Sequence, residues 1–198
     1  MLDEVNIVWF KRDLRITDHL PIYKASIESL PFIPLYVLDQ NYWSQDFSSI
    51  RHWNFVYDCL EELNIELSNI GQPLIIKKGS AAKIFKDIQS NFKINKVYAH
   101  EETSNYWVRK ENLSVKNWFV ENLIEFIEYP TNGVVRGLKS RDEWIKIKNQ
   151  RLFSEVIPSP AKVKKIENFR SDLISRKSII FEDDLIFNIQ KGGRKTGL

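Results

Sequence analysis

The sequence has little of the residues on which several common functional sites depend. It contains one cysteine, Cys59, and seven glycines among 198 residues. One cysteine cannot form an internal disulfide or build a zinc site alone, and this usage is typical of a reducing compartment, so we expect a cytoplasmic protein. The first predicted strand is followed by no Walker or Gly-x-Gly-x-x-Gly phosphate loop, and no Gly-x-Ser-x-Gly motif occurs. These absences argue against ordinary nucleotide-binding loops and against a serine hydrolase.

Long apolar runs are also missing. No segment approaches about 18 consecutive apolar residues, so we expect no membrane span. The first ten residues, MLDEVNIVWF, lack the basic start of a secretory signal, and none is expected. A hydrophobic content of 43% and a charged content of 28% instead indicate an ordinary globular domain with a substantial core.

Positive charge is concentrated in the second half of the chain. The whole sequence has a net charge of +3, whereas residues 136–177 carry 12 basic and 5 acidic side chains. Such a stretch can meet phosphate or an acidic protein surface, although a solvated surface is the simpler interpretation.

Strand and helix patterns alternate over the first 127 residues. Short apolar runs predict five buried strands, and amphipathic stretches predict the helices between them. Strands joined by helical crossovers form a parallel sheet, so the expected fold class is α/β: a five-stranded, doubly wound, Rossmann-like sheet with helices on both faces. The predicted strands are 5–10, 32–38, 73–76, 96–100 and 123–127, and the predicted helices begin at Thr17, at Ser48 or Ser49, at Ala81 and at Ser104.

The pattern changes after residue 130. We expect an α/β core over 1–130, an added turn and helix over 131–153, and a connector over 154–198 that leads toward a further domain. The connector has no sustained apolar period and would face that further domain. Without that domain we expect it to expose apolar side chains, so that the chain self-associates, has a poorly ordered tail or binds a separate partner protein. The side chains expected to be exposed are Ile166, Phe169, Ile179, Ile180, Phe181 and Phe187.

The candidate site lies at the carboxyl ends of the predicted strands, where parallel sheets of this kind bind ligands. Aromatic rings beside a few charged groups can form a flat slot for an aromatic ligand, and an arginine near a helix N-terminus suits an anionic tail. The aromatic residues could equally be core residues, and Arg51 could simply pair with Asp39 or Glu101. The candidate ligand-binding residues are Phe10, Arg12, Tyr36, Leu38, Arg51, Phe55 and Glu101, and no catalytic residue is proposed.

The histidines and tryptophans have simpler interpretations. His19, His52 and His100 lie in different segments without the spacing of a metal site, so we expect no metal site and interpret each as a surface or packing residue. Most of the six tryptophans fall on predicted buried faces, which indicates core packing rather than an electron-transfer chain.

One string carries most of the information about function. Residues 9–19, WFKRDLRITDH, resemble the start of the DNA photolyase/cryptochrome family, in which the first strand runs into an aromatic, basic, Asp-Leu-Arg pattern followed by Asp-Asn or Asp-His. Further similar motifs follow in the family's order over nearly the whole chain. They are Val37-Leu38-Asp39, Arg51 with Phe55, YAHEET at 98–103, GVVRGL at 133–138, Arg141-Asp142-x-Trp144, and GGR at 192–194.

The resemblance implies an α/β domain that packs against a helical domain, in cis or as a separate chain. In the family the helical domain holds FAD and makes most of the DNA contact, and these residues contain no such domain. The α/β domain of various relatives holds a second, antenna chromophore: a reduced folate, a deazaflavin or a flavin. Here Lys110-Glu111 replaces an Arg-Asp pair of many relatives, and Trp107 stands near the Glu of folate-binding relatives. These departures favour a deazaflavin or flavin, or an empty site, over folate.

The function expected from the sequence is therefore a light-harvesting or scaffold domain of a DNA photolyase or cryptochrome, inactive in repair by itself. Whether the chain is part of an enzyme stays open. Two alternatives also stay open: an adenine-nucleotide-binding α/β protein, and the docking half of a split photolyase.

Overall fold

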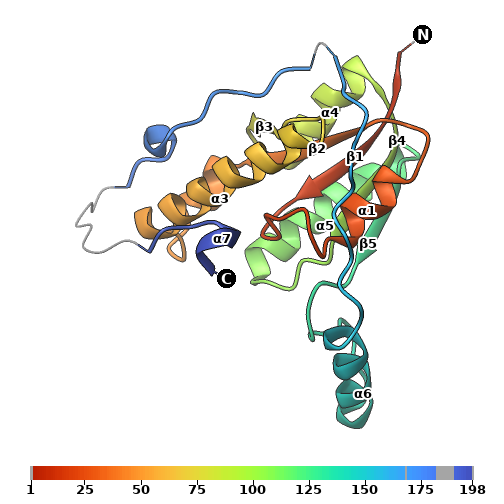
Figure 1. Ribbon diagram of the computed structural model, residues 1–198. Coiled ribbons are helices and arrows are strands. Elements are labelled where there is room, and N and C mark those ends of the chain that lie inside the picture. The colour runs from red at the N-terminus through yellow and green to blue at the C-terminus, as the bar shows by residue number, and fades with distance from the viewer. Residues whose placement is uncertain (1, 168, 182–189, 198) are drawn as a thin grey trace.

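A five-stranded, all-parallel sheet forms the centre of the molecule (Figure 1). The computed structural model describes residues 2–167, 169–181 and 190–197. The strand order is β3-β2-β1-β4-β5, so the chain moves outward from β1 in one direction and then in the other. The expected α/β fold class is confirmed. The strands are β1 (Glu4–Phe10), β2 (Phe32–Leu38), β3 (Ile75–Lys78), β4 (Lys93–His100) and β5 (Glu125–Tyr129).

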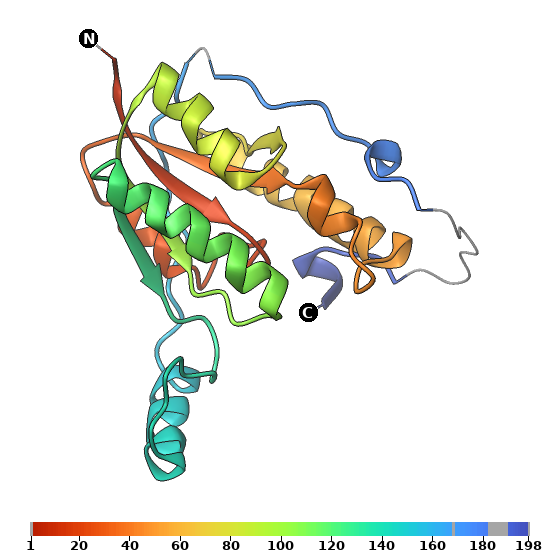
Figure 2. The ribbon, with the colours of Figure 1, turned by 180° about the vertical axis from the view of Figure 1, so that it is seen from behind.

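Helices cover both faces of this sheet (Figures 1 and 2). On one face α1 (Leu20–Ser26) and α3 (Ile50–Asn69) enclose one apolar core, and on the other α4 (Ala81–Asn91) and α5 (Tyr106–Glu121) enclose a second. The side chains of β1 alternate between the two cores, because successive residues of a strand point to opposite faces. Among the described helices, none has the length and apolar character needed to cross a membrane.

Local capping explains where two helices begin. The Ser49 side chain accepts a hydrogen bond from the His52 amide, which starts α3 where the sequence predicted. The first helix begins at Leu20 rather than at Thr17. Asp18 has a φ of 53°, which breaks the helix, and the His19 ring then caps α1 by accepting the Ile22 amide.

The connector packs on its own domain, which corrects the expectation of an exposed apolar segment. Its residues Ile166 and Ile179 are only 8% and 7% exposed, and Phe169 packs edge-on against Phe92 with ring centroids 5.4 Å apart. Of the five side chains in this set that the structure describes, only Ile180 is largely exposed, at 88%.

The structure describes one of the two remaining side chains of that set and not the other. Phe181 is half-buried against the first core. Phe187 lies outside the described residues, so the prediction for it is not tested.

The outer edge of β3 explains why the connector lies there. This edge strand has a neighbour only in β2, and unpaired backbone groups at an edge need partners. The Ile76 amide donates to Ser171 Oγ at 2.9 Å, and the Asp172 amide donates to the Ile76 carbonyl at 2.8 Å. An extended strand-like segment needs no helical period, so its apolar side chains appeared scattered in the sequence.

Helix α6 (Arg141–Leu152) projects away from the rest of the molecule (Figures 1 and 2). It packs on the preceding loop, where the Trp144 indole donates to the Gly133 carbonyl at 2.8 Å. Its outer side exposes Ile145 (53%) and Leu152 (59%), and Phe153 just beyond it is 83% exposed. Three short elements complete the fold: α2 (Gln40–Trp43), a 3₁₀ helix η1 (Arg176–Ser178) and α7 (Arg194–Gly197).

Truncating the connector's buried side chain should destabilise the domain. We expect Ile166→Ala to lower the free energy of unfolding by about 2 kcal/mol, because it leaves a cavity in the second core. The matched variant Ile180→Ala should change it by less than about 0.5 kcal/mol. Urea unfolding of both variants measures the difference, and equal stabilities would show that the connector does not pack as described.

Candidate ligand-binding site

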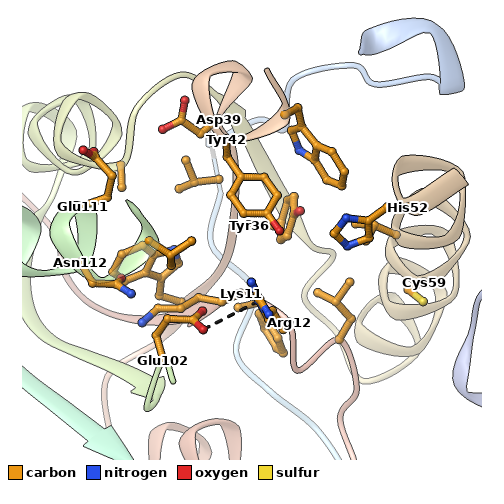
Figure 3. A pocket seen from close by; sticks show the side chains of 18 of the residues that line it. Lys11, Arg12, Tyr36, Asp39, Tyr42, His52, Cys59, Glu102, Glu111 and Asn112 are labelled. Atoms are coloured by element: carbon orange, nitrogen blue, oxygen red, sulfur yellow. Dashed lines mark ion pairs between the residues drawn. The ribbon is translucent and has the colours of Figure 1, made fainter. Parts of the chain in front are cut away.

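An aromatic-walled cavity of about 540 Å³ opens at the carboxyl end of the sheet (Figure 3). Its walls come from the loop after β1, the end of β2 with α2, one face of α3, and the first half of α5. Parallel sheets bind ligands at this position, beside the point where the strand order reverses. The aromatic side chains that line the cavity are Trp9, Phe10, Tyr36, Tyr42, Trp43, Phe55 and Trp107.

Tyr42 joins the aromatic walls on either side of the cavity. Its ring packs against Trp43 at 5.1 Å and Trp107 at 6.0 Å between centroids. Asp39 caps α2 by accepting the Asn41 amide at 2.9 Å, which places Tyr42 here. Burial raises the pKa of Tyr42 and of Tyr36, so both phenols stay neutral and can serve as flat, uncharged walls.

Two buried donors in the cavity wall have no hydrogen-bond partner among the described residues. They are Lys11 Nζ and Asn112 Nδ2. The Lys11 ammonium lies 4.4 Å from the centroid of the Trp9 ring, and burial lowers its pKa, partly offset by Glu128 and Glu102. A buried donor without an acceptor costs about 1–3 kcal/mol, and both atoms are shielded from solvent, so an acceptor atom of a bound group would reach them only after a local shift of this wall.

Charged groups lie at the mouth of the cavity. Arg12, with 57% of its side chain exposed, reaches toward Glu102, with 3.8 Å between Nε and Oε1. Beyond this pair a smaller polar cavity of about 330 Å³ shares Lys11 and Arg12 and includes Ser104, whose buried hydroxyl is also unpartnered in the described part of the chain. The two cavities are separate, and Lys11, Arg12, Arg15 and Glu102 belong to the walls of both.

The structure brings four of the seven predicted ligand-binding residues into the main cavity: Phe10, Arg12, Tyr36 and Phe55. Leu38 does not reach it, since it is 1% exposed in the first core. Glu101 lines the smaller cavity instead.

Arg51 is exposed in the first turn of α3 and does not line either cavity. The residues of α3 that face the main cavity are His52, Phe55, Val56 and Cys59. Their spacing of three, four and seven defines one helical face, and Arg51 lies outside that face.

Sequence reasoning missed the contribution of α5. Trp107, Val108, Glu111, Asn112 and Val115 all line the cavity. Their spacing is again that of one helical face, and this periodicity could have located them. Glu102 and Tyr42 carried no comparable signal, because they lie on a loop and on a four-residue helix.

The C-terminal segment closes the α3 side of the cavity. The Gly192 amide donates to Asp58 Oδ2 at 3.0 Å, and the Gly193 amide donates to Cys59 Sγ at 3.1 Å. A Cβ atom at Gly192 would lie 2.1 Å from the Phe55 carbonyl oxygen, so only glycine allows this close approach. The GGR motif therefore docks on α3, and Gly193 and Arg194 become part of the cavity wall.

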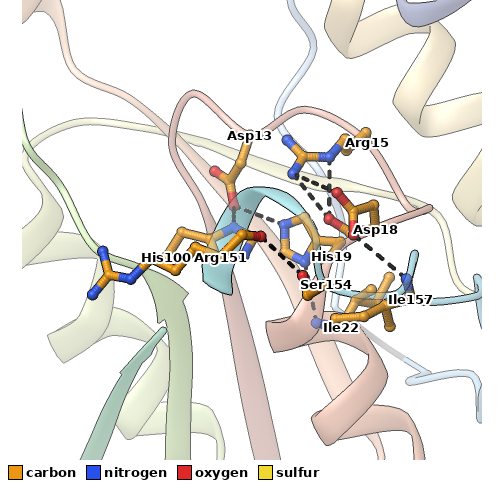
Figure 4. Close-up of polar contacts among 9 residues, drawn as sticks. All are labelled: Asp13, Arg15, Asp18, His19, Ile22, His100, Arg151, Ser154 and Ile157. Carbon is orange, nitrogen blue, oxygen red and sulfur yellow. Dashed lines mark hydrogen bonds and ion pairs between the residues drawn. The ribbon is translucent and has the colours of Figure 1, made fainter. Parts of the chain in front are cut away.

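Two histidines that were expected to lie apart meet on one carboxylate (Figure 4). His19 Nε2 and His100 Nδ1 lie 2.7 Å and 2.6 Å from Asp13 Oδ2, and all three side chains are buried. The expectation that the histidines do not cluster is wrong for this pair, because the loop after β1 carries His19 back to the end of the neighbouring strand β4. Of the described groups, this one has a spacing that could suit a metal ion.

Comparisons with known proteins agree with one another. The sequence model described as DNA photolyase matches residues 6–143. The tomato (Solanum lycopersicum) protein named cryptochrome DASH, chloroplastic/mitochondrial, is 29% identical over 119 residues, which are 57% of this chain and 21% of that protein. The crystal structure of a cryptochrome from Synechocystis sp. PCC6803 is similar with a TM-score of 0.79 at 17% identity, over all of this chain and 45% of that one.

A second solved structure is similar over nearly the same span. It is an archaeal photolyase from Sulfolobus tokodaii with two FAD molecules, with a TM-score of 0.73 at 20% identity, covering 98% of this chain and 45% of that one. At these identities the structural likeness shows the fold alone. The chain spans about a fifth of the tomato relative and less than half of each solved chain.

Loosening the C-terminal segment should expose Cys59. Gly193 has a φ of 107°, and a Cβ there would lie 2.4 Å from Glu62 Oε2. We expect Gly193→Ala to make Cys59 react about tenfold faster with the thiol reagent DTNB. A tenfold change corresponds to about 1.4 kcal/mol, which is the size of the backbone strain that a Cβ atom at this φ would add. The control Gly137→Ala also has a positive φ, 66°, but no atom within 4 Å, and should leave the rate unchanged. Equal rates in both variants would contradict the docked segment.

Proposed function

This chain belongs to the DNA photolyase family, as the motifs from residue 9 onward predicted, and we propose that it serves as the light-harvesting domain of a photolyase or cryptochrome. The observation that carries the proposal is the aromatic cavity with two unpartnered buried donors, Lys11 Nζ and Asn112 Nδ2. We propose that this cavity holds an antenna chromophore. Nothing in the described residues favours the alternative of an adenine-nucleotide-binding protein.

The cavity suits a light absorber because such a ligand needs a rigid position rather than acid or base chemistry. Neutral aromatic walls, including Tyr42 and Trp107, would pack against a planar ring and exclude water. When bound, the chromophore would absorb light and pass the excitation to FAD in a helical domain. The residues of this chain would bind and orient it, and none of them need exchange a proton with it.

The donors in the wall suit a flavin or deazaflavin, and Trp107, in place of the Glu of folate-binding relatives, argues against a folate. Lys11 and Asn112 both offer hydrogens and need acceptors, and flavin-type rings carry two carbonyl oxygens on one edge. Trp107 gives this wall an apolar surface. The S. tokodaii photolyase structure, described with two FAD molecules and the implication of a novel light-harvesting cofactor, is consistent with a flavin in a related protein.

The domain organisation is proposed on the same basis. We propose an α/β core over 1–130, an addition over 131–153 and a connector over 154–198 toward a helical FAD-binding domain in cis or in trans. The connector first packs on the core, and the exposed Ile145, Leu152 and Phe153 at α6 offer an apolar surface for that partner. DNA would be contacted mainly through the helical domain.

Removing the Lys11 ammonium should weaken flavin binding. We expect Lys11→Met to raise the Kd for flavin mononucleotide (FMN) roughly tenfold to a hundredfold, since a hydrogen bond to a charged donor contributes about 1.5–3 kcal/mol. Arg51→Ala, an exposed change outside the cavity, should leave the Kd unaltered. Fluorescence titration with FMN, and with a reduced folate in parallel, measures both. Tighter binding of the folate, or an unaffected Lys11→Met variant, would remove the flavin assignment.

The isolated 198-residue chain should show no light-driven repair of thymine dimers when FAD is added. The family places the FAD that donates the electron in the helical domain, and this chain spans less than half of its solved relatives. Illumination of a dimer-containing oligonucleotide, followed by chromatographic quantification of restored thymines, provides the measurement. Repair above an illuminated protein-free control would require a second functional site in these residues.

A further inference from the structure

The Asp13 carboxylate accepts three hydrogen bonds, from three separate parts of the chain. Oδ1 accepts the backbone amide of Lys11 at 3.0 Å. Oδ2 lies 2.7 Å from His19 Nε2 and 2.6 Å from His100 Nδ1 (Figure 4). One buried carboxylate therefore ties the cavity residue Lys11 to the start of α1 and to the end of β4.

The hydrogen-bond pattern defines the tautomer of each ring. His19 Nδ1 accepts the Ile22 amide at 3.2 Å, and a backbone amide can only donate. The hydrogen of neutral His19 is therefore on Nε2, from which it is donated to Asp13. His100 donates to the same oxygen from Nδ1. Coordination of a metal through His19 Nε2 would place a hydrogen on Nδ1 against the Ile22 amide, so the geometry favours hydrogen bonds over a metal ion.

Protonation of His19 would also place a hydrogen on Nδ1, as metal coordination would. A second hydrogen on the ring would sit on Nδ1 and face the Ile22 amide, which breaks the cap of α1. Burial is the main reason that the pKa of His19 lies below its ordinary value of 6.5, and Asp13 opposes this effect. The pKa of Asp13 is held well below its ordinary value, against the effect of burial, by the two histidines. The other charged groups that act on the pKa values of this cluster include Lys11 and Arg15, and Arg12, Glu101 and Glu102 line the smaller cavity beside Asp13 and His100.

We propose that Asp13, His19 and His100 are positioning residues that hold the Lys11 wall of the cavity, and that acid releases this wall and weakens ligand binding. The role in binding rests on the proposed function, whereas the opening of the loop does not. In the closed state His19 is buried against Asp13, and in the open state the loop after β1 has released it. A histidine whose pKa is lowered in the closed state takes up its proton at higher pH in the open state. The closed state is therefore fully favoured above pH 6.5 and loses stability as the pH falls below it.

The first test needs no ligand. Imidazole ¹⁵N spectra of the full chain at pH 7.5 should show His19 as the Nε2–H tautomer and His100 as the Nδ1–H tautomer. Hydrogen exchange, corrected for the intrinsic exchange rates, should show that the amides of residues 11–18 are less protected at pH 5.5 than at pH 7.5. His19→Asn keeps an acceptor for the α1 cap but cannot titrate, so its loop should not open over this range. Circular dichroism checks that the variant folds.

The second test measures the coupling to binding, with FMN as the probe. The Kd of the wild-type chain should rise several-fold between pH 7.5 and 5.5, at most about tenfold per pH unit for a single proton. His19→Asn should lose this dependence. His52→Asn removes the other histidine whose pKa burial lowers. Because His52 lines the cavity, this variant is compared by its pH dependence and not by its absolute Kd, and the dependence should persist.

The outcomes separate the two proposals. Absence of FMN binding at pH 7.5 would count against the flavin assignment, while hydrogen exchange would still decide the role of the cluster. A His19 ring with its hydrogen on Nδ1, displacement of both ring resonances by added Zn²⁺, or equal acid opening in His19→Asn would each overturn the positioning role.

Discussion

The structure around the cavity depends on one buried carboxylate. Asp13 accepts hydrogen bonds from the Lys11 amide, His19 and His100, and so connects the loop after β1 to the start of α1 and to the end of β4. A buried charge is stable when it is paired and hydrogen-bonded, and Asp13 accepts three hydrogen bonds here. This arrangement explains how Asp13 can be buried within a charged string, WFKRDLRITDH, whose Arg12 and Asp18 are exposed.

The cavity combines a rigid aromatic shell with polar groups that lack protein partners. The rings of Trp9, Tyr42 and Trp107 pack against the cores or against each other, which gives the cavity aromatic walls. Lys11 Nζ and Asn112 Nδ2 are buried donors in the same wall. We propose that the aromatic walls favour a flat ring and that the donors favour a ligand edge with acceptor atoms.

The connector and the C-terminal segment belong to the domain as much as its helices do. Ser171 and Asp172 supply partners to the outer edge of β3, and the Trp53 indole donates to the Arg176 carbonyl at 2.8 Å. Beyond them, Gly193 contacts Cys59 beside the cavity. A helical domain that followed this segment would therefore be joined to the chain next to the chromophore site, which suits short-range transfer of excitation.

The sequence by itself determined the class of fold and its elements. Side-chain orientation repeats every two residues in a strand and every 3.6 residues in a helix, and the order of apolar residues along the chain reflects these periods. The five strands, the long helix capped by Ser49 and the site at the strand ends were therefore predictable. The motif from residue 9 likewise indicated the family. Phe10, Arg12, Tyr36 and Phe55 could be named because they follow strands or lie on the inner face of a helix.

Only the tertiary structure decided which groups meet across these elements. His19 and His100 reach one oxygen because β1 and β4 are neighbours, an adjacency that no local pattern encodes. Arg51 does not line the cavity, because the face of α3 that meets the end of the sheet is the one that carries His52, Phe55, Val56 and Cys59. The connector packs because a sheet edge needs partners, and that requirement exists only once the sheet has formed.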